Sequence, residues 1–466
     1  MPRLVLQSVK PGLLRQLGFF SAAALVISNM VGAGIFSTTG FLAGNLGSAW
    51  MILLCWAVGA LFAFAGALSY SELGINFPSS GGEYVYLTRA FGPEWGFMTG
   101  WVSFFAGFSA PIAAAALTFS DYLGHFVPAL HMSHDSVRIG GGVFSIRVGG
   151  AQVVASTLIA AFTALNCLGV GRTAKVQNVL TSIKLVALVG FVILGMAAGS
   201  GDWSHITGPS RGGSNLLMQF FVSLLWVVWA YSGWNAATYV AEEVRNPEHT
   251  LPAALAAGTG IVALLYLGLN VVFLYSTPIP QLAEQATRGE IAIGSQAALN
   301  LFGPRISGLF SGLMALAIVS SVNAMVTVGP RVYYAMAKNR AFLPAAAMVH
   351  PRWHTPVVAI VSQGLCAILM TLTPFPDLVI YIGLSLTLFS VLTVASLFVF
   401  RRKRPAWQSL KALNFAWPLI PASYIVVGAC MMTYGVVKHP VASLTAFVTV
   451  GAGGLAYRLG LGARPA

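Results

Sequence analysis

The chain carries, inside a long apolar run near its start, the segment Ser28-Asn29-Met30-Val31-Gly32-Ala33-Gly34-Ile35-Phe36. A second apolar run has a similar small and polar interruption, Trp229-Ala230-Tyr231-Ser232-Gly233-Trp234-Asn235. Lipid does not tolerate unpaired backbone groups, so helix breaks at this depth are typical of transporters, where the freed groups line a binding site. Equivalent breaks in the first and sixth predicted helices favour two inverted repeats around a central site.

The overall composition is that of a membrane protein. Of the 466 residues, 57% are hydrophobic and 8% are charged, and the mean hydropathy is +0.79. Soluble globular proteins carry about 25% charged residues, so a soluble enzyme and a secreted domain are excluded. The apolar content also excludes disorder. We therefore expect an integral membrane protein with little mass outside the bilayer.

The uncharged runs predict about twelve transmembrane helices. A helix needs about 20 mostly apolar residues to cross the bilayer, and the uncharged stretch between Arg15 and Glu72 has room for two. A β-barrel is excluded because the runs are continuous and do not alternate. One helix is expected in each of the other runs: 95–120, 148–171, 185–201, 212–241, 250–283, 306–330, 353–376, 378–400, 412–437 and 439–457.

The basic residues predict the orientation of these helices. The formal net charge is +13. With the N-terminus inside, 18 of the 25 lysines and arginines fall in inner segments, 6 fall in outer segments, and Lys184 lies within a span. The positive-inside rule places both termini in the cytoplasm. We expect a multi-pass protein of the cell membrane, and no nucleic-acid partner is needed to explain the basic excess.

The backbone groups that the two breaks leave free predict the kind of ligand that they bind. Free N–H groups at the start of a half-helix suit a carboxylate, because that end carries partial positive charge. Free carbonyls at the end of the other half-helix suit an ammonium group. A ligand with both charges on adjacent atoms is an α-amino acid. The alternative is that the glycines only allow helices to pack closely.

The motifs resemble those of a known family, the amino acid–polyamine–organocation (APC) superfamily, and are closest to its L-type amino acid transporter group. The resemblance rests on Gly-Ala-Gly-Ile-Phe at 32–36, Pro-Ser-Ser-Gly-Gly-Glu-Tyr at 78–84, Ala-Tyr-Ser-Gly-Trp-Asn at 230–235 and Glu-Glu-Val-Arg-Asn-Pro at 242–247. It implies an all-α LeuT-type fold with broken helices 1 and 6. The parts expected are a cytoplasmic N-terminus (1–15), two five-helix repeats (16–200 and 212–400) and two additional C-terminal helices (412–460).

The resemblance also implies a binding site. The substrate carboxylate would meet amides at 32–34, and its α-amino group would meet carbonyls near 30–31 and near 229 and 232. Trp229 stands where L-type transporters usually place an aromatic gate, and Ser232, often a glycine, narrows the pocket against bulky substrates. The residues expected to bind substrate are Met30, Val31, Gly32, Ala33, Gly34, Trp229, Ser232, Gly233 and Asn235.

Lys184 is the one lysine predicted deep inside a span. A charge at that depth costs about 2.5–3.5 kcal/mol even on insertion scales, so a function is expected for it. Its ammonium beside the first break could occupy the place of a sodium ion, and L-type relatives carry a lysine here. This predicts sodium independence. The alternative is a lysine that extends to the cytoplasmic interface.

Several polar residues lie at helix ends or in later spans. Ser80 and Glu83 have capping-box spacing and predict a short amphipathic helix on the cytoplasmic side. Glu72 is expected at a solvated or paired helix end. The sequence leaves the roles of two further sets of residues open. Glu242 and Glu243 either pair with Arg331 or Arg15 in an inner gate or are solvated, and the central cavity could also be lined by Ser320, Ser321 and Asn323.

The sequence thus predicts a secondary transporter of neutral α-amino acids that works by alternating access. Neutral substrates are favoured because no acidic residue is predicted at pocket depth; a cationic amino acid or a polyamine is the alternative. Exchange and proton coupling both stay open, because Lys184 can be a fixed or a titrating cation. No catalytic residues, cofactor, metal or obligatory protein partner are predicted, and neither an intramembrane enzyme nor a channel fits.

Overall fold

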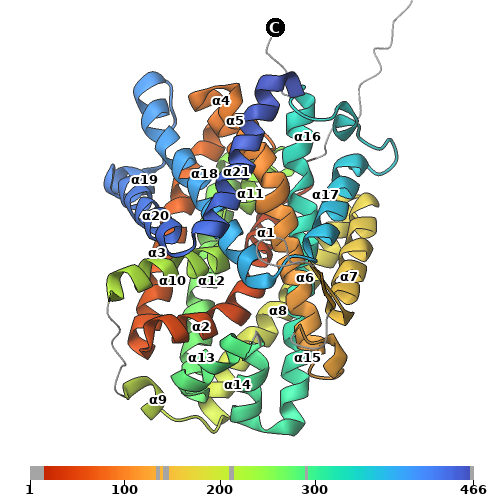
Figure 1. Cartoon of the computed structure of the whole chain (residues 1–466). Helices are drawn as coiled ribbons and strands as arrows, with labels where there is room; N and C mark the ends of the chain where they lie inside the picture. The colour runs from red at the N-terminus through yellow and green to blue at the C-terminus, as the bar shows by residue number, and fades with distance from the viewer. Residues whose placement is uncertain (1–14, 133–136, 140–145, 209–214, 289–291, 462–466) are drawn as a thin grey trace, which may run out of the picture.

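Helices make up almost all of the structure, a computed structural model of the chain (Figure 1). It describes residues 15–132, 137–139, 146–208, 215–288 and 292–461. The predicted cytoplasmic segment 1–15 therefore lies, apart from Arg15, outside the described residues.

The elements follow the predicted apolar runs. The first half contains α1 (Phe19–Met30), α2 (Ala33–Leu46), α3 (Ala49–Asn76), α4 (Glu83–Phe91), α5 (Pro93–Val102), α6 (Ala110–Leu123), strands β1 (Val137–Ile139) and β2 (Ile146–Val148), α7 (Gly150–Cys167), α8 (Val170–Ala198) and α9 (Ser204–Thr207). The second half contains α10 (Leu216–Tyr231), α11 (Ala236–Tyr239), α12 (Pro247–Ser276), α13 (Ile279–Arg288), α14 (Ile293–Phe302), α15 (Pro304–Val328), α16 (Pro330–Lys338), α17 (Val357–Met370), α18 (Phe375–Lys403), α19 (Lys411–Phe415), α20 (Leu419–Lys438) and α21 (Pro440–Ala456).

The helices are long and apolar enough for a membrane protein. Ten helical segments of the described chain meet the length and hydropathy of a membrane span, and two further apolar helices, α10 and α17, are shorter. The strands β1 and β2 form only a short antiparallel hairpin between α6 and α7, in which Val137 lies opposite Val148. The expectation of a helical membrane protein is confirmed.

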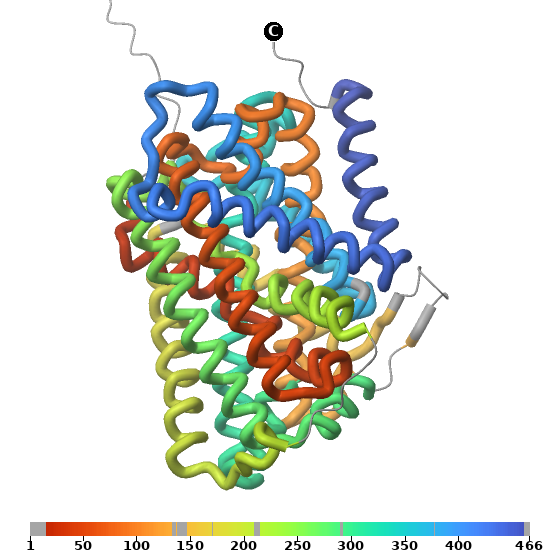
Figure 2. Tube along the Cα trace, turned by 90° about the vertical axis from the view of Figure 1, so that its left-hand side faces the viewer, coloured from red at the N-terminus to blue at the C-terminus, as the bar shows by residue number. Residues whose placement is uncertain are grey.

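The first helices lie inside the bundle and the last ones at its edge. Every residue of α1 from Ala22 to Met30 is buried, and α1 contacts both α12 and α15. In α21 only four residues are buried, and Figure 2 shows this dark blue helix at the side of the molecule, where it contacts α5 and α18. The breaks in α1–α2 and α10–α11 thus lie where protein, and not lipid, surrounds the backbone.

The short helix predicted after Pro78 is present, but the capping box is not. The helix α4 begins at Glu83, its N-cap is Gly82, and no side chain caps it. The Ser80 hydroxyl has no hydrogen-bond partner among the described residues, and Glu83 points into the protein, where 5% of it is exposed. The capping-box prediction was wrong because the Glu83 carboxyl finds partners on other helices.

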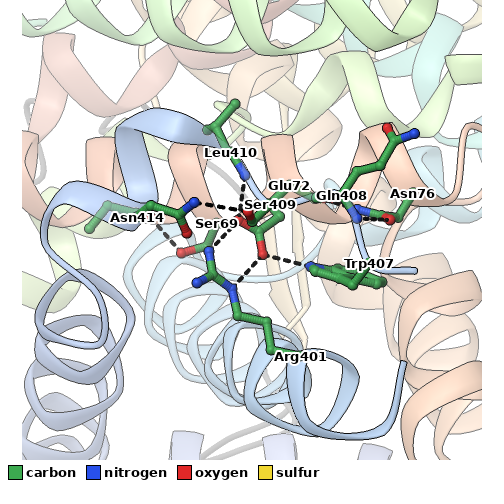
Figure 3. Close-up of polar contacts among 10 residues, drawn as sticks. Ser69, Glu72, Asn76, Arg401, Trp407, Gln408, Ser409, Leu410 and Asn414 are labelled. Atoms are coloured by element: carbon green, nitrogen blue, oxygen red, sulfur yellow. Dashed lines mark hydrogen bonds and ion pairs between the residues drawn. The ribbon is translucent and has the colours of Figure 1, made fainter. Parts of the chain in front are cut away.

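Glu72 ties α3 to the segment that follows α18 (Figure 3). Its carboxylate accepts two hydrogen bonds from the Arg401 guanidinium, at 2.7 and 2.6 Å, and one from the Trp407 indole N–H at 2.7 Å. The backbone N–H of Leu410 donates a further bond at 2.9 Å. Glu72 is fully buried and paired, so of the two alternatives for this helix end the paired one is correct.

We expect Glu72→Gln to destabilise the protein by about 2–4 kcal/mol, because it leaves the largely buried Arg401 charge without its counter-charge. The change is measured as a lower temperature for loss of the monodisperse peak in detergent. Glu94→Gln is the matched control: Glu94 pairs with Arg458 at 3.2 Å, but both side chains are exposed, so its loss should cost less than about 1 kcal/mol. Equal effects of the two variants would contradict the prediction.

Candidate substrate and ion site

Both interruptions predicted from the sequence are breaks in the backbone. The helix α1 ends at Met30 and α2 begins at Ala33, with Val31 between them in an extended conformation (ψ 90°). The helix α10 ends at Tyr231, and the chain turns through Gly233 before α11 begins. Gly233 has a φ of +101°, which residues with a Cβ rarely adopt, so glycine is required there.

The two breaks pack directly against each other. A Cβ added to Gly34 would lie 2.3 Å from the Ala230 Cα, and one added to Gly233 would lie 2.8 Å from the Asn29 carbonyl carbon. Each broken helix therefore presents a glycine to the backbone of the other. The glycines therefore allow close packing at the same positions where the helices are interrupted.

The hydroxyl of Tyr266, in α12, joins the C-terminal ends of α1 and α10. It lies 2.6 Å from the Met30 carbonyl and 3.0 Å from the Ala230 carbonyl. The side chain is fully buried, so its single O–H is shared between two carbonyls that the helix ends leave unpaired. Sequence reasoning missed Tyr266, because nothing local distinguishes it from other aromatic residues in apolar runs.

The Lys184 ammonium lies against the carbonyl end of α1. Its Nζ donates to the Val31 carbonyl at 2.6 Å and to the Ser321 hydroxyl at 2.9 Å, and it is 3.5 Å from the Ser28 carbonyl. Only 1% of the residue is exposed, so the alternative of a lysine extending to the interface is wrong. Within the described residues its partners are uncharged oxygens, and the partial negative charge of a helix C-terminus compensates its charge.

A chain of buried polar side chains leads away from this lysine. The Ser28 hydroxyl is hydrogen-bonded to Thr181 (2.6 Å) and Ser320 (3.0 Å), and Gln177 donates to both of these. Ser320, Ser321 and Asn323 therefore belong to this network and do not line the cavity described below. The chain continues through Asn323, Asn166 and Thr327 by bonds of 2.7–2.9 Å.

The polar chain ends at a buried ion pair. Arg331 donates to the Thr327 carbonyl at 2.6 Å and to the Glu243 carboxylate at 2.9 Å, and both charged side chains are 1% exposed. The Glu243 carbonyl in turn accepts the N–H of Leu17 at 2.9 Å. Of the alternatives drawn from the sequence, pairing of Glu243 with Arg331 is correct, whereas Glu242 lies 3.7 Å from the exposed Lys338.

A cavity borders the second break. Four of the predicted binding residues line it, namely Trp229, Ser232, Gly233 and Asn235. The rest of its wall includes Asn29 of α1, Glu83 of α4 and the aromatic residues Phe108, Trp234, Tyr239 and Tyr424. Residues 30–34 are not part of this wall. The structure thus brings the second-break residues together around one space, while the first break packs against Ala230, Tyr266 and Lys184.

Glu83 contributes a buried carboxyl group to the cavity wall. The Tyr70 hydroxyl donates to its Oε1 at 2.5 Å, and the Asn235 amide donates to the same oxygen at 3.2 Å. The helix α4 is not one of the membrane spans. Burial raises the pKa of Glu83 to about 7, although hydrogen bonds from Tyr70, Tyr239 and Asn235 lower it. The expectation that no acidic residue lies at pocket depth was therefore wrong, because Glu83 enters from a short helix.

Comparison with known proteins identifies the family. The model of the amino acid permease family matches residues 17–454, and the chain belongs to this family. It is a transporter and not an enzyme, and the resemblance to the L-type branch of the APC superfamily is confirmed.

Three relatives illustrate the similarity. The serine/threonine exchanger SteT of Bacillus subtilis (strain 168) is 28% identical over 91% of this chain and 92% of its own length. The large neutral amino acids transporter small subunit 2 of Oryctolagus cuniculus is 27% identical over 92% and 77%, respectively. The Asc-type amino acid transporter 1 of Mus musculus is 26% identical over 93% and 78%.

We expect Gly34→Ala to cost about 1–3 kcal/mol of stability, because the added methyl group would overlap backbone atoms of Ala230. The measurement is the yield and thermal stability of monodisperse protein in detergent. Gly190→Ala, in the membrane helix α8, is the control, since nothing lies within 4 Å of its added Cβ. If Gly34→Ala were as stable as Gly190→Ala, the two breaks would not be in contact.

Proposed function

We propose that this amino acid permease is a secondary transporter of neutral α-amino acids that works by alternating access around its two broken helices. The observation that carries the proposal is the direct contact between the α1–α2 and α10–α11 breaks, beside a cavity lined by second-break residues. Relatives whose names refer to large neutral amino acids and to serine and threonine support the substrate class.

In this proposal the substrate binds at the breaks through backbone groups. Its carboxylate accepts hydrogen bonds from the amides of residues 32–34 at the positive end of α2. Its α-amino group donates to carbonyls near Met30, Trp229 and Ser232. The Val31 carbonyl already accepts bonds from Lys184 and Ser321, which uses both of its lone pairs. Trp229, at the cavity wall, acts as the aromatic gate.

Sodium independence is the second part of the proposal. The Lys184 ammonium lies where the α1 carbonyl end has a partial negative charge. A fixed cation at this point removes the need for a bound metal cation.

The proposed arrangement in the membrane has twelve spans, which are the ten long segments together with α10 and α17. The first ten form the two LeuT-type inverted repeats, and α20 and α21 are the additional pair. The protein lies in the cell membrane in this proposal, with both termini in the cytoplasm. We also propose that it works without a partner chain, although the name of the rabbit relative describes that protein as a small subunit.

A cationic amino acid or a polyamine is the second candidate substrate. The observation that favours it is Glu83 in the cavity wall, because a carboxylate can balance a cationic side chain. With Glu83 in the cavity wall, the support for neutral substrates comes from the relatives.

The test uses purified protein in liposomes and labelled serine, threonine and leucine in sodium-free buffer. We expect saturable uptake that is unchanged by sodium, and comparison of liposomes with and without internal amino acid separates exchange from net transport. Competition by lysine, arginine and spermidine is measured in parallel. Absence of neutral uptake together with uptake of a cationic compound would overturn the neutral assignment.

We expect Lys184→Met to lower exchange by about ten-fold to a hundred-fold, because hydrogen bonds from a charged donor are worth about 1.5–3 kcal/mol. Lys175→Met is the control, since Lys175 is an exposed lysine of the same helix and its loss should leave exchange unchanged. Full exchange by Lys184→Met in sodium-free buffer would contradict the role of this lysine.

A further inference from the structure

The cavity wall contains one buried carboxyl group without a cationic partner. The other buried charged side chains among the described residues have partners: Glu72 pairs with Arg401, Glu243 with Arg331 and Asp121 with His131, and Lys184 donates to the Val31 carbonyl. Glu83 is 5% exposed, and among the described residues it forms no ion pair. A buried carboxylate in this position is costly unless it is neutralised.

Within the described ranges, the titratable groups that face Glu83 are tyrosines. They are Tyr70 of α3, Tyr86 of α4 itself, Tyr239 of α11 and Tyr424 of α20. A tyrosine keeps its proton at neutral pH, so these residues can donate hydrogen bonds to Glu83 but cannot supply a positive charge. The group that can neutralise the carboxylate from the cavity is therefore a cation that enters it, and the smallest such cation is the proton.

Asn235 links this carboxyl group to the second break. Its amide donates to Glu83 Oε1 at 3.2 Å and to the Tyr239 hydroxyl at 3.0 Å, and the residue is two positions after Gly233. A proton added to Glu83 therefore changes the charge of an acceptor that holds the wall of the proposed substrate site. Lys184 does not line this cavity; its Nζ contacts the Val31 carbonyl, the Ser321 hydroxyl and the Ser28 carbonyl.

We propose that Glu83 is the proton-binding site of the transport cycle, and that the protein must carry a proton on this carboxyl group to transport neutral amino acids. The proposal rests on the proposed function. The proton passes from water in the cavity to the carboxylate before the substrate is enclosed. It returns to water after the substrate is released, so the cycle needs no other proton donor or acceptor. A pKa of about 7 for Glu83 means that the carboxyl is protonated below neutral pH and ionised above it.

The experiment measures exchange of labelled neutral amino acid between pH 5.5 and 8.5, with equal pH on both sides of the liposome membrane. We expect exchange by the natural protein to fall as the pH rises through about 7, approaching ten-fold per pH unit above it. Glu83→Gln mimics the protonated form, and its exchange should vary less than two-fold across the range. Glu94→Gln, which changes an exposed carboxylate, should keep the natural profile.

A binding measurement gives a second readout. Calorimetry of substrate binding near pH 7, in buffers of different ionisation enthalpy, should show proton uptake by the natural protein and none by Glu83→Gln. Three results would each overturn the inference. They are exchange by the natural protein that does not depend on pH, a pH profile of Glu83→Gln equal to the natural one, and a monodisperse Glu83→Gln protein that binds no substrate at any pH. Absence of neutral binding and exchange in the natural protein would instead overturn the proposed function.

Discussion

The architecture depends on one constraint, the need to satisfy backbone groups that two helix breaks expose inside an apolar interior. Lipid offers these groups no partner, so the breaks can exist only where protein supplies one. The Tyr266 hydroxyl reaches the carbonyls of Met30 and Ala230, and the Lys184 ammonium reaches that of Val31. Because Gly34 and Gly233 allow backbone-to-backbone contact, both breaks share the same small volume.

Buried charged side chains need partners for the same reason. Glu72 and Glu243 each accept hydrogen bonds from an arginine, and Lys184 donates to carbonyl and hydroxyl oxygens. A buried charge without such partners would cost several kcal/mol. The carboxyl group of Glu83 is different because its donors are neutral and it borders the cavity. In the part of the chain that the structure describes, Glu83 is thus a buried carboxyl group without a cationic partner beside the residues proposed to bind substrate.

Buried polar side chains connect Ser28 with Arg331. They form a continuous hydrogen-bonded path from the neighbourhood of Lys184 to the Arg331–Glu243 pair, through helices α1, α8, α15 and α7. The Glu243 carbonyl also holds the backbone of Leu17, just before α1. The proposed alternating-access movement of α1 would therefore have to rearrange this path and the ion pair at its end.

Local sequence by itself determined the membrane class, the long spans, both helix breaks and the burial of Lys184, because hydropathy, charge and glycine placement act over neighbouring residues. Only the tertiary structure decided which side chains are hydrogen-bonded to one another and to the backbone at the breaks. Tyr266 and Met30 are 236 positions apart, and Asn235 and Glu83 are 152 apart. Glu83 also carried a misleading local signal, since capping-box spacing predicts a helix start and says nothing of the face that is buried. Contacts of this kind arise when separate helices pack, and no single run encodes them.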